Sequence, residues 1–307
     1  MPELPEVETI RRGLAGVLVG QKLLTCKGFT GSVRSGKMGG RVVGLRRFGK
    51  LLVIDFDNGE SLAFHLRMTG QLIYRALTPS VSSSGPALIG SVAGGHPNKS
   101  FVGELPDKTT RAVFEFEKGV LFFNDQRKFG LFEFLPSLEV EKMPFVAKLG
   151  PEPWKMTVLE LKKRLLRHKK SKIKAVLLDQ TVMAGLGNIY ADETLFLAGV
   201  HPERLAGDLN DDEIAKIIEG AKKSMEASLK SGGSSLRNYL RVDGSYGDYL
   251  TLFANVYGRA GERCKVCGEK IAKIKVAVRG THFCPRCQRA SKTVGGVAEV
   301  ANKRRRK

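Results

Sequence analysis

The sequence contains no long uninterrupted run of apolar residues, and its N-terminus lacks the apolar core of a secretory signal. These absences exclude a helix long enough to cross a bilayer and a secretory leader. We therefore expect a cytoplasmic protein without a membrane partner, associated with the nucleoid if it is bacterial. Acidic residues are also too few to balance the basic ones: 31 stand against 51, giving a formal net charge of +20. Such a chain requires a polyanionic partner, and nucleic acid is the first candidate.

Cysteine is scarce as well, and four of the five cysteines lie close to the C-terminus. They form two pairs, Cys264 with Cys267 and Cys284 with Cys287, separated by sixteen residues. This spacing predicts one structural Zn²⁺ held by four thiolates, and in a reducing compartment it favours metal over disulfides; free thiols or a redox pair are the alternatives. Cys26 stands alone in an apolar run, where we expect a small core residue and not a thiol nucleophile.

The order of the predicted elements indicates an α+β protein of two domains. One helical stretch at the N-terminus is followed by short β-rich runs, and helical patterns fill the second half. Strands in series followed by helices favour a β-sandwich domain and then a helical domain. The predicted strands are Lys22–Cys26, Arg41–Arg46, Leu51–Phe56, Ser61–Leu66, Ala112–Glu117, Val120–Asn124 and Leu131–Phe134.

Breaks in composition suggest the domain limits. Residues 78–106 are rich in serine and glycine and predict a loop insertion, and the prolines near residue 151 predict an interdomain connection. In the zinc region, Ile271–Val278 and Thr281–Phe283 predict a hairpin with Arg279 at its tip. The expected divisions are 1–150, 151–256, 257–290 and a basic tail, 291–307, that we expect to be disordered.

Two features of the second half predict phosphate binding without reference to any family. The first is a basic cluster, 167–174, which includes Lys169 and Lys174 and directly precedes an apolar helix. The second is a loop around Gly185 and Gly187 followed by a helix, because glycines let backbone N–H groups approach an anion at a helix N-terminus.

The first residues carry the most reactive groups of the chain. Removal of Met1 would leave a free secondary amine at Pro2, and an α-amino group titrates near roughly pH 8, so part of it is an unprotonated nucleophile at neutral pH. Glu3 and Glu6 stand beside it on one face of the helix that starts here, as an acid/base pair would. The alternative is structural, since proline and acidic residues are common at helix starts.

The string PELPEVETIRRGL at the N-terminus closely resembles the start of the formamidopyrimidine-DNA glycosylases, the bifunctional enzymes of base-excision repair. The string AGLGNIYADE at 184–193, the sequence Tyr257-Gly258-Arg259 and the paired cysteines extend the resemblance over nearly the whole chain. It implies a helix-two-turn-helix domain with a zinc-finger hairpin. It also implies a monomeric DNA glycosylase and AP lyase that removes 8-oxoguanine and formamidopyrimidines from damaged double-stranded DNA, through an N-terminal proline iminium intermediate and β,δ-elimination.

The resemblance assigns catalytic roles to five residues. Pro2 is implied to be the nucleophile and Glu3 the proton-transfer residue, while Glu6 orients the site. Lys50 and Arg279 are implied to stabilise the phosphate and sugar of the lesion.

Further residues are implied to bind DNA. Those expected to enter the base stack are Met68, Arg127 and Phe129. Lys174 and Asn188 are expected at phosphates, and Lys169 and Tyr257 are further expected DNA-binding residues. The chain departs from the family near Lys108, where Thr109 replaces a phosphate-contacting histidine and can donate a hydrogen bond but carries no charge. It also has Gln126 and Lys128 where proline and arginine are common. Two alternatives stay open: an endonuclease VIII-like enzyme for oxidised pyrimidines, and a non-catalytic zinc-ribbon protein that binds nucleic acid.

Overall fold

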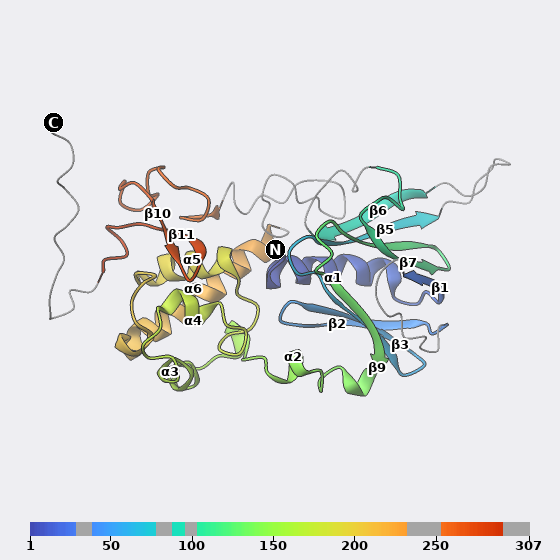
Figure 1. Ribbon diagram of the computed structural model, residues 1–307, viewed down its shortest axis with the longest axis horizontal. Coiled ribbons are helices and arrows are strands. Elements are labelled where there is room, and N and C mark those ends of the chain that lie inside the picture. Colours follow the sequence, from blue (N-terminus) through green and yellow to red (C-terminus); the bar gives the residue numbers. More distant parts are fainter. Residues whose placement is uncertain (29–38, 78–87, 96–102, 232–252, 291–307) are drawn as a thin grey trace.

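A computed structural model of the chain describes residues 1–28, 39–77, 88–95, 103–231 and 253–290 (Figure 1). The predicted tail 291–307 and parts of the predicted insertion 78–106 lie outside these ranges, as does most of 243–256, where the family resemblance implies a loop over the extruded base. Within the described residues, no helix is both long and apolar enough to cross a membrane.

The N-terminal half is one helix and two antiparallel sheets. Helix α1 (Leu4–Leu18) lies between the sheets in Figure 1, and its apolar side, including Val7, Ile10 and Leu14, joins a core to which both sheets contribute. One sheet has the order β1-β7-β8-β5-β6 and the other β2-β3-β4-β9. The strands are β1 (Leu23–Gly28), β2 (Val42–Phe48), β3 (Leu51–Phe56), β4 (Glu60–His65), β5 (Gly70–Leu77), β6 (Leu88–Gly95), β7 (Thr110–Phe116), β8 (Gly119–Asp125) and β9 (Leu131–Pro136).

All seven predicted strands are confirmed to within about two residues, but two strands were missed. β5 pairs with β8 at the centre of its sheet, and β6 pairs with β5 at the edge. The prediction of a loop throughout 78–106 is therefore wrong for Leu88–Gly95. Its serine- and glycine-rich surroundings concealed a strand that is formed by pairing with a neighbour and not by strong local propensity.

The second half is mainly helical and joins the sandwich through short helical turns. The linking turns are η2 (Ser137–Glu139), α2 (Pro144–Ala147) and η3 (Pro153–Lys155). The helical elements are α3 (Val158–Leu166), α4 (Ile173–Leu177), α5 (Asn188–Ala198), η4 (Ala206–Asp208) and α6 (Asp211–Lys230). Two of these helices begin at capping side chains: Thr157 accepts from the Glu160 N–H at 3.2 Å and Asn210 from the Glu213 N–H at 2.9 Å.

The zinc region forms the predicted hairpin, β10 (Ala272–Val276) and β11 (Arg279–Phe283), beside α5. Its tip, however, is Ala277-Val278, both with positive φ, and Arg279 is the first residue of β11, paired with Val276. The expectation of Arg279 in the turn itself is corrected. The Arg-Gly pair suggested a turn, but the register places the two-residue turn two positions earlier.

Candidate active site at the N-terminus

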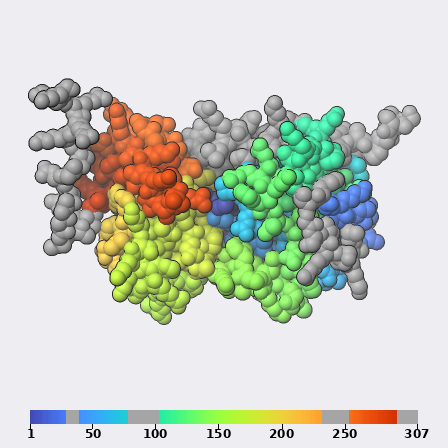
Figure 2. Space-filling model, in the orientation of Figure 1, coloured from blue at the N-terminus to red at the C-terminus, as the bar shows by residue number. Residues whose placement is uncertain are grey.

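The N-terminus lies where the two halves of the molecule meet (Figure 1). In Figure 2 the dark-blue atoms of the first residues show as a small patch in the seam beside the red zinc hairpin. Pro2, Glu3 and Glu6 are all buried, whereas Met1 is exposed. The predicted nucleophile and its two carboxylates are therefore brought together in the interior, at the start of α1.

Glu3 binds the N-terminus of α5. Its carboxylate accepts backbone hydrogen bonds from Gly187 at 2.7 Å, Ile189 at 3.0 Å and Tyr190 at 3.3 Å. The anion expected at this glycine loop and helix N-terminus is thus a carboxylate of the protein itself, which corrects the prediction of a phosphate there. The same contacts join the sandwich domain to the helical domain.

The two glycines of this loop are required by close packing. A Cβ at Gly187 would lie 2.3 Å from the carboxyl carbon of Glu3, and one at Gly185 would lie 2.4 Å from the Leu4 side chain. Gly185 also has φ of +93° and accepts the Leu4 N–H at 3.1 Å. The Gly-x-Gly spacing therefore lets the first turn of α1 approach the loop.

Glu6 connects the start of α1 to α5 and α6. One carboxylate oxygen accepts the Glu3 N–H at 2.8 Å, and the other accepts the Tyr190 hydroxyl at 2.6 Å. The Tyr190 hydroxyl also lies 2.5 Å from the Ser228 hydroxyl. Sequence reasoning identified Glu6 but missed Tyr190 and Ser228. Tyr190 belongs to the conspicuous 184–193 string, whereas no local feature marks Ser228.

Lys50 supplies a buried cation next to these carboxylates. Its ammonium group donates to the Leu186 carbonyl at 2.6 Å. Burial lowers the pKa of Lys50, the negative charges of Glu3 and Glu6 oppose this, and Arg279 adds to it. Burial likewise raises the pKa of Glu3, against the positive charge of Lys50. The site therefore contains a carboxyl group with enhanced affinity for a proton and an ammonium group with reduced affinity.

Arg279 is exposed on the hairpin, and its charge acts on both Lys50 and Lys174. The hairpin is held by α4 and α5: Lys174 donates to the Gly280 carbonyl at 3.1 Å and the Thr281 hydroxyl at 2.8 Å, and Asn188 donates to the same carbonyl at 3.0 Å.

Lys174 also forms a fully buried ion pair with Asp192 at 2.6 Å. Lys174 is therefore engaged within the protein, and a contact between Lys174 and DNA would require this network to open. Asp192 was missed by sequence reasoning, although it lies within the 184–193 string. It also accepts the His282 N–H of β11 at 2.8 Å.

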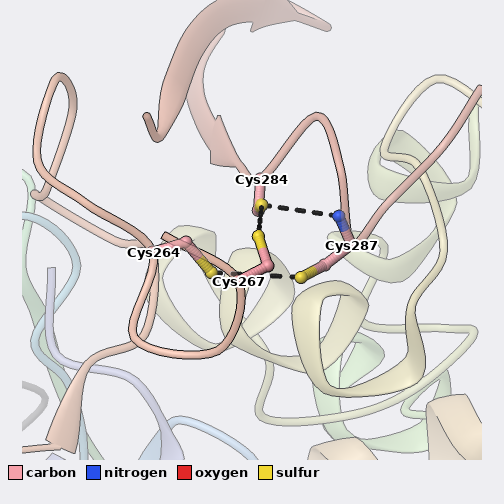
Figure 3. Close-up of side chains that lie close together, drawn as sticks. All are labelled: Cys264, Cys267, Cys284 and Cys287. Carbon is pink, nitrogen blue, oxygen red and sulfur yellow. Dashed lines mark hydrogen bonds between the residues drawn. The ribbon is translucent and has the colours of Figure 1, made fainter. Parts of the chain in front are cut away.

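The four paired cysteines converge at the base of the hairpin (Figure 3). Their sulfur atoms all lie within 4.8 Å of one another, with 3.9 Å between Cys264 and Cys287 and 3.4 Å between Cys267 and Cys284. Tetrahedral zinc with Zn–S bonds of about 2.3 Å separates its sulfurs by about 3.8 Å, so the four residues fit one structural Zn²⁺. Cys26 lies apart in β1, where it is partly buried against the sandwich core, and burial raises the pKa of its thiol to about 11.

The turns β4–β5 and β8–β9 carry the predicted wedge residues. Asp125 joins them: it accepts the Thr69 hydroxyl from one turn, and from the other the Arg127 N–H at 3.1 Å and the Gly130 N–H at 2.6 Å. Phe129 is 52% exposed, and the Arg127 guanidinium lies 4.8 Å from its ring centroid. Asp125 was not predicted, although it stands directly before the turn.

These turns lie at the Lys50 end of the sheet. The register pairs Leu51, which follows Lys50, with His65, and His65 with Leu131. Burial and the charges of Arg67 and Lys50 lower the pKa of His65 to about 4. Met68 therefore lies in a turn that begins beside the N-terminal site.

Family models match three segments of the chain. They are described as formamidopyrimidine-DNA glycosylase N-terminal domain, over residues 1–132, formamidopyrimidine-DNA glycosylase H2TH domain, over 149–239, and zinc finger found in FPG and IleRS, over 261–290. The formamidopyrimidine-DNA glycosylase of Desulfitobacterium hafniense is 37% identical over 299 residues, covering 94% of this chain and all of that one. This chain belongs to the formamidopyrimidine-DNA glycosylase family.

Solved structures of such glycosylases have the same fold as this chain. A mutant of Lactococcus lactis FPG bound to DNA containing Fapy-dG superposes with a TM-score of 0.79 at 34% identity. MutM bound to DNA containing carbocyclic 8-oxo-G gives 0.77 at 33% identity. In each case 94% of this chain and 100% of the other are covered. The α+β fold and the zinc finger are confirmed, and the chain has the DNA glycosylase and AP lyase activities of its family. The alternative of a non-catalytic zinc-ribbon protein is wrong.

The remaining residues that the glycosylase resemblance assigned to DNA differ in their placement. Thr109 is buried, and its hydroxyl donates to Asp107 at 2.7 Å. Tyr257 packs edge-on against His282, and burial raises its pKa. Lys169 is exposed, beyond the end of α3. The structure therefore leaves Lys169 free to meet DNA, but engages the Thr109 hydroxyl within its own loop.

Proposed function

We propose that this glycosylase removes oxidised purines, 8-oxoguanine and formamidopyrimidines, from duplex DNA, with the amine of Pro2 as nucleophile. The observation that carries the proposal is the burial of a proton-binding carboxyl group, Glu3, directly after Pro2 and within the field of Lys50. Removal of Met1 would make the Pro2 nitrogen the chain terminus. A secondary amine in such a site can form a covalent iminium intermediate.

The chemistry follows from these groups. The Pro2 nitrogen forms a bond to C1′ of the damaged nucleotide as the bond from C1′ to the base breaks, and the base leaves with the bonding electrons and takes up a proton. The Pro2 nitrogen, protonated after forming the new bond, gives up its proton to the departing base. Its restored lone pair then expels the ring oxygen O4′, which takes a proton from Glu3, and C1′ becomes an iminium carbon. The raised pKa of Glu3 suits this donation.

Strand cleavage would follow from the iminium. Loss of a C2′ proton expels the 3′-phosphate in β-elimination, and loss of a further proton expels the 5′-phosphate in δ-elimination. Water then releases the sugar fragment and restores Pro2. Lys50 and Arg279 bring positive charge to the expected position of the lesion's phosphates. The charge of Arg279 lowers the pKa of Lys50, which supports placing the two cations at one site.

Extrusion of the damaged nucleotide is assigned to the two joined turns. Met68, Arg127 and the exposed Phe129 would enter the base stack, at a cost of a few kcal/mol for unstacking. Lys169 would contact phosphate, and Asn188 and Tyr257 would act at the edge of the hairpin. For Lys174 the buried ion pair supports a role in holding Arg279 and not a phosphate contact.

We take oxidised purines to be the preferred substrates because two solved relatives are bound to DNA that carries them, while wild-type Lactococcus lactis FPG has also been solved with DNA containing an oxidised pyrimidine. The N-terminal match is to the formamidopyrimidine-DNA glycosylase domain, and the cited complexes carry Fapy-dG and 8-oxo-G. The endonuclease VIII-like alternative predicts the opposite order of cleavage rates on duplexes with one oxidised pyrimidine or one 8-oxoguanine.

The test is borohydride trapping on a duplex containing one 8-oxoguanine, with intact-mass analysis of the N-terminus. We expect an adduct that maps to Pro2 and that disappears when one extra residue precedes this proline. Protein that lacks Met1, binds the duplex and gives no adduct on either the lesion or an abasic site would overturn the mechanism.

A further inference from the structure

The hydroxyl of Tyr190 is the centre of a buried hydrogen-bonded network behind the N-terminus. Tyr190 on α5 and Ser228 on α6 are both fully buried. The Tyr190 hydroxyl donates to a Glu6 carboxylate oxygen at 2.6 Å and lies 2.5 Å from the Ser228 hydroxyl. Three elements that are distant in the sequence thus meet at one oxygen atom.

The network reaches the proposed nucleophile through one peptide group. The second carboxylate oxygen of Glu6 accepts the Glu3 N–H at 2.8 Å. That N–H belongs to the planar peptide that carries the carbonyl of Pro2, so its direction sets the plane from which the Pro2 ring projects. A side chain that fixes the Glu6 carboxylate therefore fixes the peptide next to the reacting amine.

The chemistry of the hydroxyl suits a permanent donor. Burial raises the pKa of Tyr190 well above its ordinary value, and the negative charge of Glu6 raises it further. The phenol keeps its proton and donates it to a carboxylate, which is the stronger class of hydrogen bond. Ser228 occupies the opposite side of the same oxygen and limits its movement.

We propose that Tyr190, supported by Ser228, is a positioning residue that holds Glu6 and, through the Glu3 peptide, orients Pro2 for attack. The inference rests on the proposed function of Pro2. It gives α6 a part in the reaction that its amphipathic pattern, typical of scaffold, does not suggest.

The test is a double-mutant cycle of Tyr190→Phe and Glu6→Gln. The rate constant of borohydride trapping is measured at saturating enzyme on a duplex with one abasic site, and the Kd on a duplex with a tetrahydrofuran residue. We expect Tyr190→Phe to slow trapping on the order of 10- to 100-fold with the Kd changed less than about twofold, because misplacement of a reacting group affects the chemical step. In the double variant, Tyr190→Phe should add little to the effect of Glu6→Gln, because both act through one contact.

Two further variants keep the test sharp if Tyr190→Phe folds poorly. Ser228→Ala leaves the Tyr190 contact with Glu6 in place and should slow trapping by a smaller factor. Tyr74→Phe is the matched control: its buried hydroxyl accepts a hydrogen bond from Gln21 at 2.9 Å within the sandwich. It should form the trapped adduct at the wild-type rate, and its effect on the rate constant should multiply with that of Glu6→Gln.

Effects of Tyr190→Phe and Glu6→Gln that multiply, or slower trapping that merely follows a weaker Kd, would overturn the positioning role. Trapping of the wild type at Pro2 together with a wild-type rate for Tyr190→Phe would overturn it alone and leave the proposed function standing. A wild type that never forms the Pro2 adduct would remove both.

Discussion

At the scale of single residues, Glu3 has two tasks that compete for one carboxylate. It accepts three backbone N–H groups at the start of α5, and it is the proposed proton donor next to Pro2. The hydrogen bonds favour its ionised form, whereas burial, the larger effect, favours the protonated form. Its position therefore depends on the absence of any side chain at Gly187.

Gly187→Ala tests this dependence. The new Cβ would lie 2.3 Å from the carboxyl carbon of Glu3, and three hydrogen bonds prevent that carboxylate from moving freely. We expect a loss of about 1–3 kcal/mol of unfolding free energy and trapping at least about tenfold slower. Gly16→Ala is the control, since nothing lies within 4 Å of the added Cβ and the site is inside α1. Its unfolding free energy should rise by about 0.5–1 kcal/mol, and its rate of borohydride trapping should equal that of the wild type. Equal behaviour of the two variants in urea unfolding and trapping would argue against the packing role.

At the scale of elements, the zinc hairpin is too small to fold on its own hydrophobic core. Its apolar contacts form a separate small cluster around Val256, Ile271 and the cysteines, packed on Phe196 of α5. The metal therefore sets the position of β11, and with it Arg279. The ties from Lys174 and Asp192 orient the hairpin only once it is folded.

Removal of zinc with a strong chelator should release the hairpin and weaken binding to lesion DNA at least about tenfold, the equivalent of one lost charged hydrogen bond. The sandwich has its own core and should stay folded. Metal analysis, far-UV circular dichroism and Kd measurement on one sample would show this. Cys26→Ser should keep both zinc and affinity, because Cys26 packs on the sandwich core. A metal-free protein with unchanged Kd would contradict the role of the hairpin.

At the scale of the whole molecule, an ionic network ties α1 to the interdomain connection. Arg47 in β2 donates to Glu8 at 3.1 Å and to both carboxylate oxygens of Glu152 at 2.6 and 3.0 Å. Glu8 also accepts from Arg11 and Arg12, each at 2.8 Å. Burial alone would raise the pKa of Glu8, but these arginines outweigh it and lower the pKa from 4.5 to about 2.

The lowered pKa predicts a specific dependence of stability on pH. The contribution of ionised Glu8 is complete above about pH 4.5 and is lost as the pH falls toward 2. Glu8→Gln should therefore cost about 1–2 kcal/mol of unfolding free energy at pH 7, a value reduced for partial solvent exposure, and the cost should shrink from pH 4.5 downward. Urea unfolding at pH 7 and pH 3 would measure it. Glu139→Gln is the control, because it breaks an exposed ion pair with Lys142. It should change the unfolding free energy by less than about 0.5 kcal/mol at both pH values. A cost for Glu8→Gln that does not change with pH would refute the assignment.

Local features of the sequence predicted much of the fold and part of the site. The strands and the four zinc ligands depend on spacing within a few residues, and the structure confirms them. Strand β6 and the Ala277-Val278 tip escaped prediction because pairing with a partner strand decided them. The role of Lys50 came from the family resemblance, and that of Pro2 from its amine chemistry together with the resemblance; both stay predictions. The limits 1–150, 151–256 and 257–290 also stay predictions.

The sequence by itself determined the chemical groups of this protein: an amine and carboxylates at one end, a zinc site at the other, and an excess of positive charge between them. Only the tertiary structure decided which of these groups meet. The Glu3 carboxylate binds the N-terminus of α5, and Lys174 is buried in an ion pair with Asp192. The Tyr190 hydroxyl contacts both Glu6 and Ser228. The physical reason is that a buried charge or hydroxyl must find a partner, and the partner is set by packing between domains and not by distance along the chain.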